Sequence, residues 1–194
     1  MEPIKQHTGL VYPLNRTNVD TDQIIPKQFL KSIKRTGFGK HLFHNWRFDE
    51  DGKERADFSL NDSKYKEASI LVAGENFGMG SSREHAPWSL LDYGFRAVIS
   101  SSLADIFHNN SLKNGLLAIE VDKEQVDKWL KAAEEGELTL SIDLEAKTIT
   151  DNNEGTVIDF DIPEYNRQNM LNGWDEIDLT LQLEDKITAY EQSR

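Results

Sequence analysis

The middle of the chain alternates short apolar runs with amphipathic segments. Three apolar runs have the length and residue types of buried strands: residues 68–74, 95–101 and 116–121. The segments between them, 85–94 and 103–115, are typical of helices, and each ends at a glycine. This alternation predicts an α/β layout.

The N-terminal third has less regular patterning. Residues 8–14 predict a first strand that ends at Pro13. The stretch "NVDTDQIIP", residues 18–26, has the asparagine and aspartates of side-chain-stabilised turns, and its proline suits the first position of a short helix. Residues 37–66 predict a short helix and an exposed loop.

Alternating patterns return towards the C-terminus. Residues 122–136 predict an amphipathic helix with Asp122 as its cap. Residues 138–151 and 156–162 alternate as antiparallel strands do, and helix is expected from Pro163 to the end. Together with the α/β middle, these elements predict a mixed sheet with flanking helices.

Composition narrows the class of protein. The 194 residues contain no repeat or low-complexity linker, so we expect one domain over 1–194. No apolar run is long enough for a membrane span and no signal-peptide core is present, which favours a cytoplasmic protein. A net charge of −12 argues against nucleic acid and anionic membranes as partners. There are no cysteines, so thiolate metal ligands are excluded.

The basic residues are concentrated in one place. Residues 23–48 contain no acid but carry six cations: Lys27, Lys31, Lys34, Arg35, Lys40 and Arg47. A solvated basic face explains this pattern, and so does a local positive field that attracts a small anion. The two interpretations stay open without a site nearby.

The stretch "GENFGMGSSREHAPW", residues 74–88, is the main candidate for chemistry. It lacks the lysine of a P-loop, and Arg83 stands where a dinucleotide fingerprint has its third glycine. It also lacks the flanking glycines of a nucleophile elbow. The spacing of His85 and His108 does not suggest a serine hydrolase triad. His41 and His44 could share a helical face, but without a third ligand we interpret them as surface residues.

A positive interpretation follows from Pro87, which fits best in a first helical turn. A helix starting near residues 83–85 leaves Ser81 and Ser82 where free N–H groups and the positive helix end meet, which makes an anion site. Arg83 adds a guanidinium that can hold a carboxylate with two hydrogen bonds. The alternative is a capping box between Ser81 and Glu84. The density of glycines, which lets the backbone approach a ligand closely, favours the anion site.

These motifs carry a family resemblance. The stretch "GENFGMGSSREHAPWSLLDYGFRAVISSSLADIFHNNSLKNGLL", with "NVDTDQIIPKQFL" upstream, closely resembles the small subunits of 3-isopropylmalate dehydratase. The sequence "GSSREH" alone would indicate only the wider aconitase superfamily, but the resemblance covers nearly the whole chain. It implies a swivelling β/β/α domain like the mobile fourth domain of aconitase.

The resemblance also implies a partner and a reaction. The partner is a large subunit that holds a [4Fe–4S] cluster, and a chain without cysteines agrees with a cluster held elsewhere. The reaction is the isomerisation of 2-isopropylmalate to 3-isopropylmalate through isopropylmaleate, in leucine biosynthesis. No metal or cofactor is expected on this chain.

Site roles follow by motif from the resemblance. Ser81 would be the general base, acting as an alkoxide that N–H groups and cations stabilise. Arg83 would bind a substrate carboxylate and Ser82 would add a hydrogen bond. Thr21 and Asp22 match the family's "DTD" turn beside the site, where they would bind substrate.

The resemblance leaves the substrate-facing loop open. It implies that residues 23–48 form a mobile loop facing substrate and the large subunit, with Lys31, Lys34 or Arg35 towards substrate. Related dehydratases of homoaconitate, citramalate or dimethylmaleate share the core motifs. A carboxylate-binding module without catalysis is a further alternative, against which the intact Ser81 and Arg83 argue.

Overall fold

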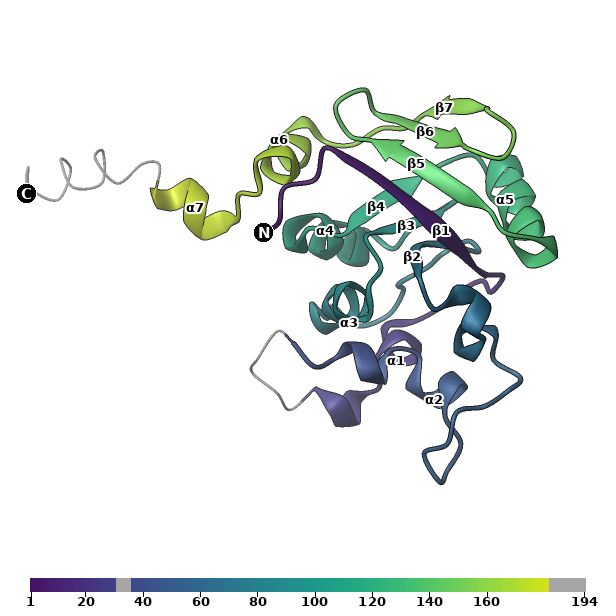
Figure 1. Ribbon diagram of the computed structural model, residues 1–194. Coiled ribbons are helices and arrows are strands. Elements are labelled where there is room, and N and C mark those ends of the chain that lie inside the picture. Colours follow the sequence, from purple (N-terminus) through teal and green to yellow (C-terminus); the bar gives the residue numbers. More distant parts are fainter. Residues whose placement is uncertain (31–35, 182–194) are drawn as a thin grey trace, which may run out of the picture.

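One curved mixed sheet organises the chain (Figure 1). The computed structural model describes residues 1–30 and 36–181. Their strands are β1 (Gln6–Leu14), β2 (Ala68–Ala73), β3 (Ala97–Ser100), β4 (Leu117–Glu120), β5 (Thr139–Asp143), β6 (Thr148–Asp151) and β7 (Val157–Asp159). The strand order is β4-β3-β2-β1-β5-β6-β7. The predicted α/β fold with a mixed sheet and flanking helices is therefore confirmed.

Short and long helices surround this sheet. The α-helices are α1 (Thr21–Ile24), α2 (His44–Arg47), α3 (His85–Tyr93), α4 (Asp105–Asn114), α5 (Lys123–Glu135), α6 (Glu164–Asn172) and α7 (Glu176–Leu181). The 3-10 helices are η1 (Lys27–Phe29), η2 (Gly39–His41), η3 (Ser59–Asn61) and η4 (Ser63–Tyr65). Helices α3 and α4 pack on each other, whereas α5 packs along β1, β2 and β3.

Strand β1 joins the two halves of the sheet. Residues 10–14 pair parallel with β2, whereas residues 6–10 pair antiparallel with β5. The parallel half, β1 to β4, is covered on both faces, so β2 and β3 are buried almost throughout. In β5 and β6 every second residue is buried, because only one face of the antiparallel half meets the core.

The structure corrects several predicted boundaries. β1 starts at Gln6 and runs through Pro13 to Leu14. Proline has no N–H for the hydrogen-bond ladder, but Pro13 lies near the end of the strand, where this loss destabilises the sheet little. Residues 37–66 form four short helices and bury several aromatic rings, rather than one helix and an exposed loop. Pro26 precedes η1 instead of starting it.

The caps and the C-terminal helices also differ from expectation. Asp122 holds the N-cap position of α5, but its side chain makes no cap hydrogen bond. The helix expected from Pro163 onwards is interrupted at Gly173, whose φ of +72° ends α6. The continuation beyond residue 181 lies outside the described residues.

Candidate active site

A capped turn after β1 builds one side of the site. The Asp20 carboxylate accepts the N–H of Gln23 at 2.7 Å, and the Gln23 side chain accepts the N–H of Asp20 at 2.9 Å. This reciprocal capping box starts α1 and fixes the direction of the two residues that follow Asp20. Thr21 is buried, and Asp22 lies partly exposed beside it.

The glycine-rich loop after β2 builds the other side. Gly78 and Gly80 have φ values of +82° and +94°, which side-chain-bearing residues rarely adopt. These glycines turn the loop back along the 18–22 turn. The N–H of Gly78 donates to the Val19 carbonyl at 2.7 Å, and the N–H of Thr21 donates to the Met79 carbonyl at 2.9 Å.

Thr21 links the two segments at Ser81, the candidate general base. Its hydroxyl donates to the backbone carbonyl of Ser81 at 3.0 Å. The side chains of Ser81 and Ser82 are exposed, and no hydrogen bond to either hydroxyl occurs among the described residues. The main chain of Ser81 is therefore held while its hydroxyl is available to a ligand.

Arg83 directly follows this exposed pair in the sequence. Its side chain is only 9% exposed, and its guanidinium binds the Asp22 carboxylate through Nη1–Oδ1 at 2.5 Å and Nη2–Oδ2 at 3.1 Å. The hydrogen bonds from Arg83, more than its charge or that of Lys27, hold the pKa of Asp22 below its ordinary value. Lys27 lies 3.7 Å from the same carboxylate. The guanidinium is thus fixed in place by an internal counter-ion.

The start of α3 excludes one of the two interpretations of the serines. The helix begins at His85, with Glu84 at the N-cap and no side-chain cap hydrogen bond. The alternative capping box between Ser81 and Glu84 is therefore wrong. Within the described part of the chain, no hydrogen bond engages the backbone N–H groups of Ser82, Arg83 or Glu84. These donors and the helix start together favour an anion beside Ser81.

The histidines do not join this site. His85 packs against Phe38 and Trp88, and His108 lies on α4 without a contact to either serine. His41 stacks on Phe29 with a centroid distance of 3.8 Å, and His44 meets the same ring edge to face. Both rings are partly buried rather than the surface residues expected.

The described residues also contain no group of three or more His, Asp or Glu side chains arranged to hold a metal ion. Nor does any helix in the part of the chain that the structure describes have the length and apolar character needed to cross a membrane.

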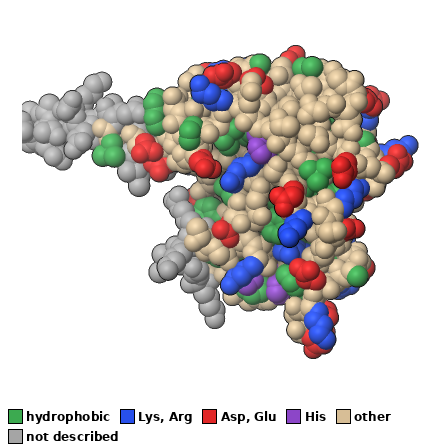
Figure 2. Space-filling model, in the orientation of Figure 1, with side chains coloured by type: hydrophobic (Ala, Val, Ile, Leu, Met, Phe, Trp, Pro, Cys, Tyr) green, Lys and Arg blue, Asp and Glu red, His purple; other side chains and the backbone are tan. Residues whose placement is uncertain are grey.

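The structure describes only part of the basic segment 23–48. Lys31, Lys34 and Arg35 lie outside the described residues. Of the three described cations, Lys27 pairs with Asp22 and Arg47 lies 3.6 Å from Glu54, so acids from elsewhere offset these two, whereas Lys40 is exposed. Acidic and basic side chains are interspersed over the face shown in Figure 2. Among the described residues, these two pairs therefore weaken the local positive field that was one of the two interpretations of this segment.

Comparisons with known proteins show the family of the chain. The family model for the aconitase C-terminal domain matches residues 1–124. The model LeuD_N matches residues 127–164, and the model for the C-terminal domain of 3-isopropylmalate dehydratase small subunits matches residues 176–194. A small subunit of this dehydratase from Oceanobacillus iheyensis is 60% identical over 193 residues, covering 100% of both chains. The chain belongs to the family of 3-isopropylmalate dehydratase small subunits.

Further relatives extend this result to the fold. The family member from Bacillus subtilis is 52% identical over 194 residues, covering 100% of this chain and 97% of the relative. The crystal structure of 3-isopropylmalate dehydratase LeuD from Methanocaldococcus jannaschii superposes with a TM-score of 0.68 at 26% identity. That comparison covers 96% of this chain and 99% of the archaeal chain. The family resemblance of the motifs is confirmed, and so is the fold it implied.

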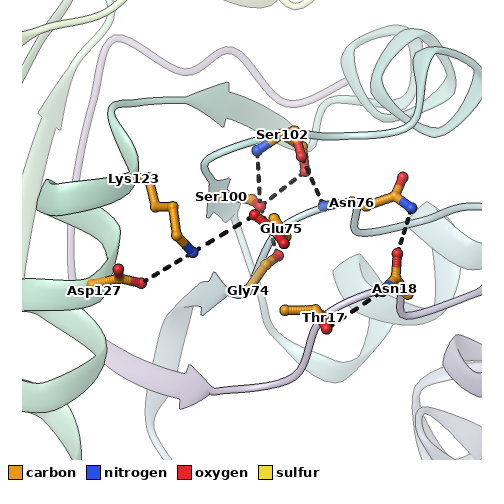
Figure 3. A network of polar contacts seen from close by, with 9 residues as sticks. All are labelled: Thr17, Asn18, Gly74, Glu75, Asn76, Ser100, Ser102, Lys123 and Asp127. Atoms are coloured by element: carbon orange, nitrogen blue, oxygen red, sulfur yellow. Dashed lines mark hydrogen bonds and ion pairs between the residues drawn. The ribbon is translucent and has the colours of Figure 1, made fainter.

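Sequence reasoning missed the supports of the site. Asn18 and Asn76 join the two turns, and Ser100 and Ser102 brace the base of the glycine-rich loop (Figure 3). Asn18 was recognised only as a turn residue. The sequence did contain a signal for both residues. Each asparagine follows a predicted strand and lies two to four residues before a predicted site residue or a glycine of the turn.

Proposed function

We propose that this chain supplies the catalytic base and a carboxylate-binding arginine to a 3-isopropylmalate dehydratase. The reaction is the interconversion of 2-isopropylmalate and 3-isopropylmalate through isopropylmaleate, a step of leucine biosynthesis. The names of the relatives and the match of family models along the chain support this assignment.

The observation that carries the proposal is the contrast between Ser81 and Arg83. The Ser81 hydroxyl is exposed and free of hydrogen bonds to the described residues, while its carbonyl is held by Thr21. The Arg83 guanidinium is buried and fixed by Asp22. A hydroxyl without an internal partner among the described residues and a fixed cation two residues later in the sequence suit proton abstraction next to a carboxylate.

In this proposal Ser81 removes the proton from the carbon next to a substrate carboxylate. A serine alkoxide needs strong stabilisation, which the free N–H groups of residues 82–84, the start of α3 and Arg83 can supply. Ser82 is proposed to donate a further hydrogen bond to the substrate. As the proton leaves, hydroxide leaves the neighbouring carbon and isopropylmaleate forms. In the second half of the isomerisation, the Ser81 hydroxyl donates its proton to the carbon that lost the hydroxide, while water adds its hydroxyl to the carbon that lost the proton, so the same residue serves dehydration and rehydration.

Substrate binding falls to Arg83 and its surroundings. A guanidinium has five N–H donors, and the Asp22 pair uses two of them, so a substrate carboxylate can bind the others. Thr21 and Asp22 are proposed to act on the substrate mainly through Ser81 and Arg83, which they contact. Lys31, Lys34 and Arg35 are proposed to face the substrate from their loop.

The [4Fe–4S] cluster is proposed to belong to a separate large subunit. This chain has no cysteine, and its described residues offer no group of ligands for a metal. The residues present therefore do not fit the cluster, and the chain's share of the chemistry is binding, orientation and proton transfer. We further propose that the complex is a heterodimer or a multiple of it, located in the cytoplasm.

Reconstitution tests this assignment. The chain alone should show no turnover, and mixing with an iron–sulfur large subunit reconstituted without oxygen should generate the ultraviolet absorbance of isopropylmaleate from 2-isopropylmalate. Homoaconitate, citramalate and dimethylmaleate, assayed in parallel, establish the substrate range. Turnover by this chain alone in the presence of a chelator would contradict the proposal.

A further inference from the structure

Two asparagines that lie far apart in the sequence join the two turns of the site. Nδ2 of Asn76 donates to Oδ1 of Asn18 at 2.7 Å (Figure 3). The two residues have φ values of +57° and +55°. Asparagine is one of the few side-chain-bearing residues that tolerate this region, so both positions combine a special backbone with a specific side chain.

A ladder of hydrogen bonds runs from this pair to Ser81, the candidate general base. It starts with the Asn18 N–H, which donates to the Glu75 carbonyl at 3.0 Å. The rungs between Gly78 and Val19 and between Thr21 and Met79 follow, and the Thr21 hydroxyl on the Ser81 carbonyl ends the ladder. The asparagine pair therefore lies at the start of the series of hydrogen bonds that holds Ser81.

The start of this ladder, in the loop after β2, is fixed by residues at the end of β3 and just after it. The Ser102 hydroxyl accepts the N–H of Asn76 at 2.8 Å, and the Ser100 hydroxyl donates to the Gly74 carbonyl at 2.8 Å. Figure 3 shows these serines on one side of Asn76 and Asn18 on the other. The loop after β2 is thus anchored to the sheet, and the amide of Asn76 transfers that anchor to the turn after β1.

We propose that Asn18 and Asn76 form a positioning pair that sets the register between the two turns and so places Ser81 against Arg83. The proposal rests on the proposed function, since it assigns the pair to that reaction. Neither asparagine needs to touch the substrate. A small shift between the turns would move Ser81 with one segment and Asp22, which holds Arg83, with the other, and misplacement of this kind lowers rates strongly.

The test uses the complex with the iron–sulfur large subunit and the variants Asn18→Gly, Asn76→Gly and their combination. Glycine tolerates the positive φ and removes the side chain, while adding backbone freedom at that residue. Each single variant should lower kcat per assembled complex by about ten-fold. The double variant should lose about as much as either single, because the residues act as a unit. The matched control is Asn152→Ala, which removes an exposed amide bonded to Ser141 at 2.9 Å in the antiparallel half of the sheet.

A second measurement separates this proposal from the proposed function. In the isolated chain, hydrogen exchange at the amides of Thr21 and Gly78 should be faster in both single variants than in the wild type or the control. Unchanged exchange at these amides would overturn the positioning pair. So would faster exchange with kcat within about two-fold of wild type, or single losses that multiply in the double variant. Full turnover of Ser81→Ala in the kcat assay of the assembled complex would instead overturn the proposed function.

Discussion

The carboxylate of Asp22 and the guanidinium of Arg83 face each other in a two-pronged contact, although 61 positions separate them in the sequence. Arg83 is nearly buried, whereas 44% of the Asp22 side chain is exposed. The exposed partner therefore lies on the solvent side of a buried cation. In the isolated chain, Asp22 holds the guanidinium of Arg83, which a substrate carboxylate is proposed to bind.

Asp22→Asn should lower kcat/KM by about ten-fold, because it removes a charge-assisted hydrogen bond that orients Arg83. The measurement is steady-state kinetics of the assembled enzyme, with Asp49→Asn, an exposed aspartate of the 49–53 turn, as the control. A rise in kcat/KM would show that Asp22 competes with the substrate for Arg83 instead of positioning it.

Arg83→Lys keeps the positive charge but loses the planar fork, so it cannot reproduce the two-pronged contact. We expect a marked rise in KM with a smaller loss of kcat, since the guanidinium is proposed to bind substrate and to stabilise the alkoxide. An unchanged KM would remove Arg83 from substrate binding. Assembly with the large subunit, followed by sedimentation, shows whether the variant remains folded.

Ser81→Ala should lower kcat by about 10²–10⁴-fold, the usual cost of losing an acid–base group, with little change in KM. Its melting temperature should stay close to wild type, because the Ser81 hydroxyl makes no hydrogen bond with the described residues and does not cap α3. Ser82→Ala is the comparison, since Ser82 is proposed to donate a hydrogen bond to the substrate and not to remove the proton. A larger kcat loss in Ser82→Ala would place the base one residue later.

Gly78→Ala should destabilise the chain by about 1–3 kcal/mol, the usual cost of overpacking, with additional strain from the positive φ. A methyl group at this position would overlap the buried ring of Phe107. Gly80→Ala is the comparison, since its nearest neighbour would be the Cβ of Asp20 at 3.6 Å. Thermal unfolding should therefore show the larger loss for Gly78→Ala, and equal losses would contradict the packing.

Acidification from about pH 7 to about pH 5.5 should lower the melting temperature. Burial, the largest cause in each case, lowers the pKa of His41, His44 and His85 from 6.5. The folded chain therefore binds fewer protons than the unfolded chain between these lowered values and 6.5. Stability rises with pH in that window and is lost as pH falls through it.

The variant His44→Phe tests this origin. It keeps an aromatic ring against Phe29 and Phe48 but binds no proton, so its melting temperature should fall less over the same window. Asp22, whose pKa is lowered from 3.8, acts only below that value and does not interfere. A steeper fall in His44→Phe than in wild type would exclude this histidine as a cause.

Local patterns were sufficient for much of the fold. The apolar runs that became β2, β3 and β4 were recognised because strands buried on both faces are apolar throughout. Gly94 and Gly115 marked the ends of α3 and α4, since a positive φ at these positions ends a helix. The extent of β1 and the interrupted C-terminal helices were missed, because strand pairing and the conformation of Gly173 decided them.

The sequence by itself determined the chemistry of the site: a hydroxyl, a guanidinium and a glycine-rich turn within residues 78–83. It could not show that Asp22 would bind Arg83, that Thr21 would hold the Ser81 carbonyl, or that Asn18 would meet Asn76. Those contacts arise because β1 and β2 pair in parallel, which brings their carboxyl ends to the same edge of the sheet. The side chains proposed to act lie close together in the sequence, whereas their orientation depended on a strand pairing between segments about 60 residues apart.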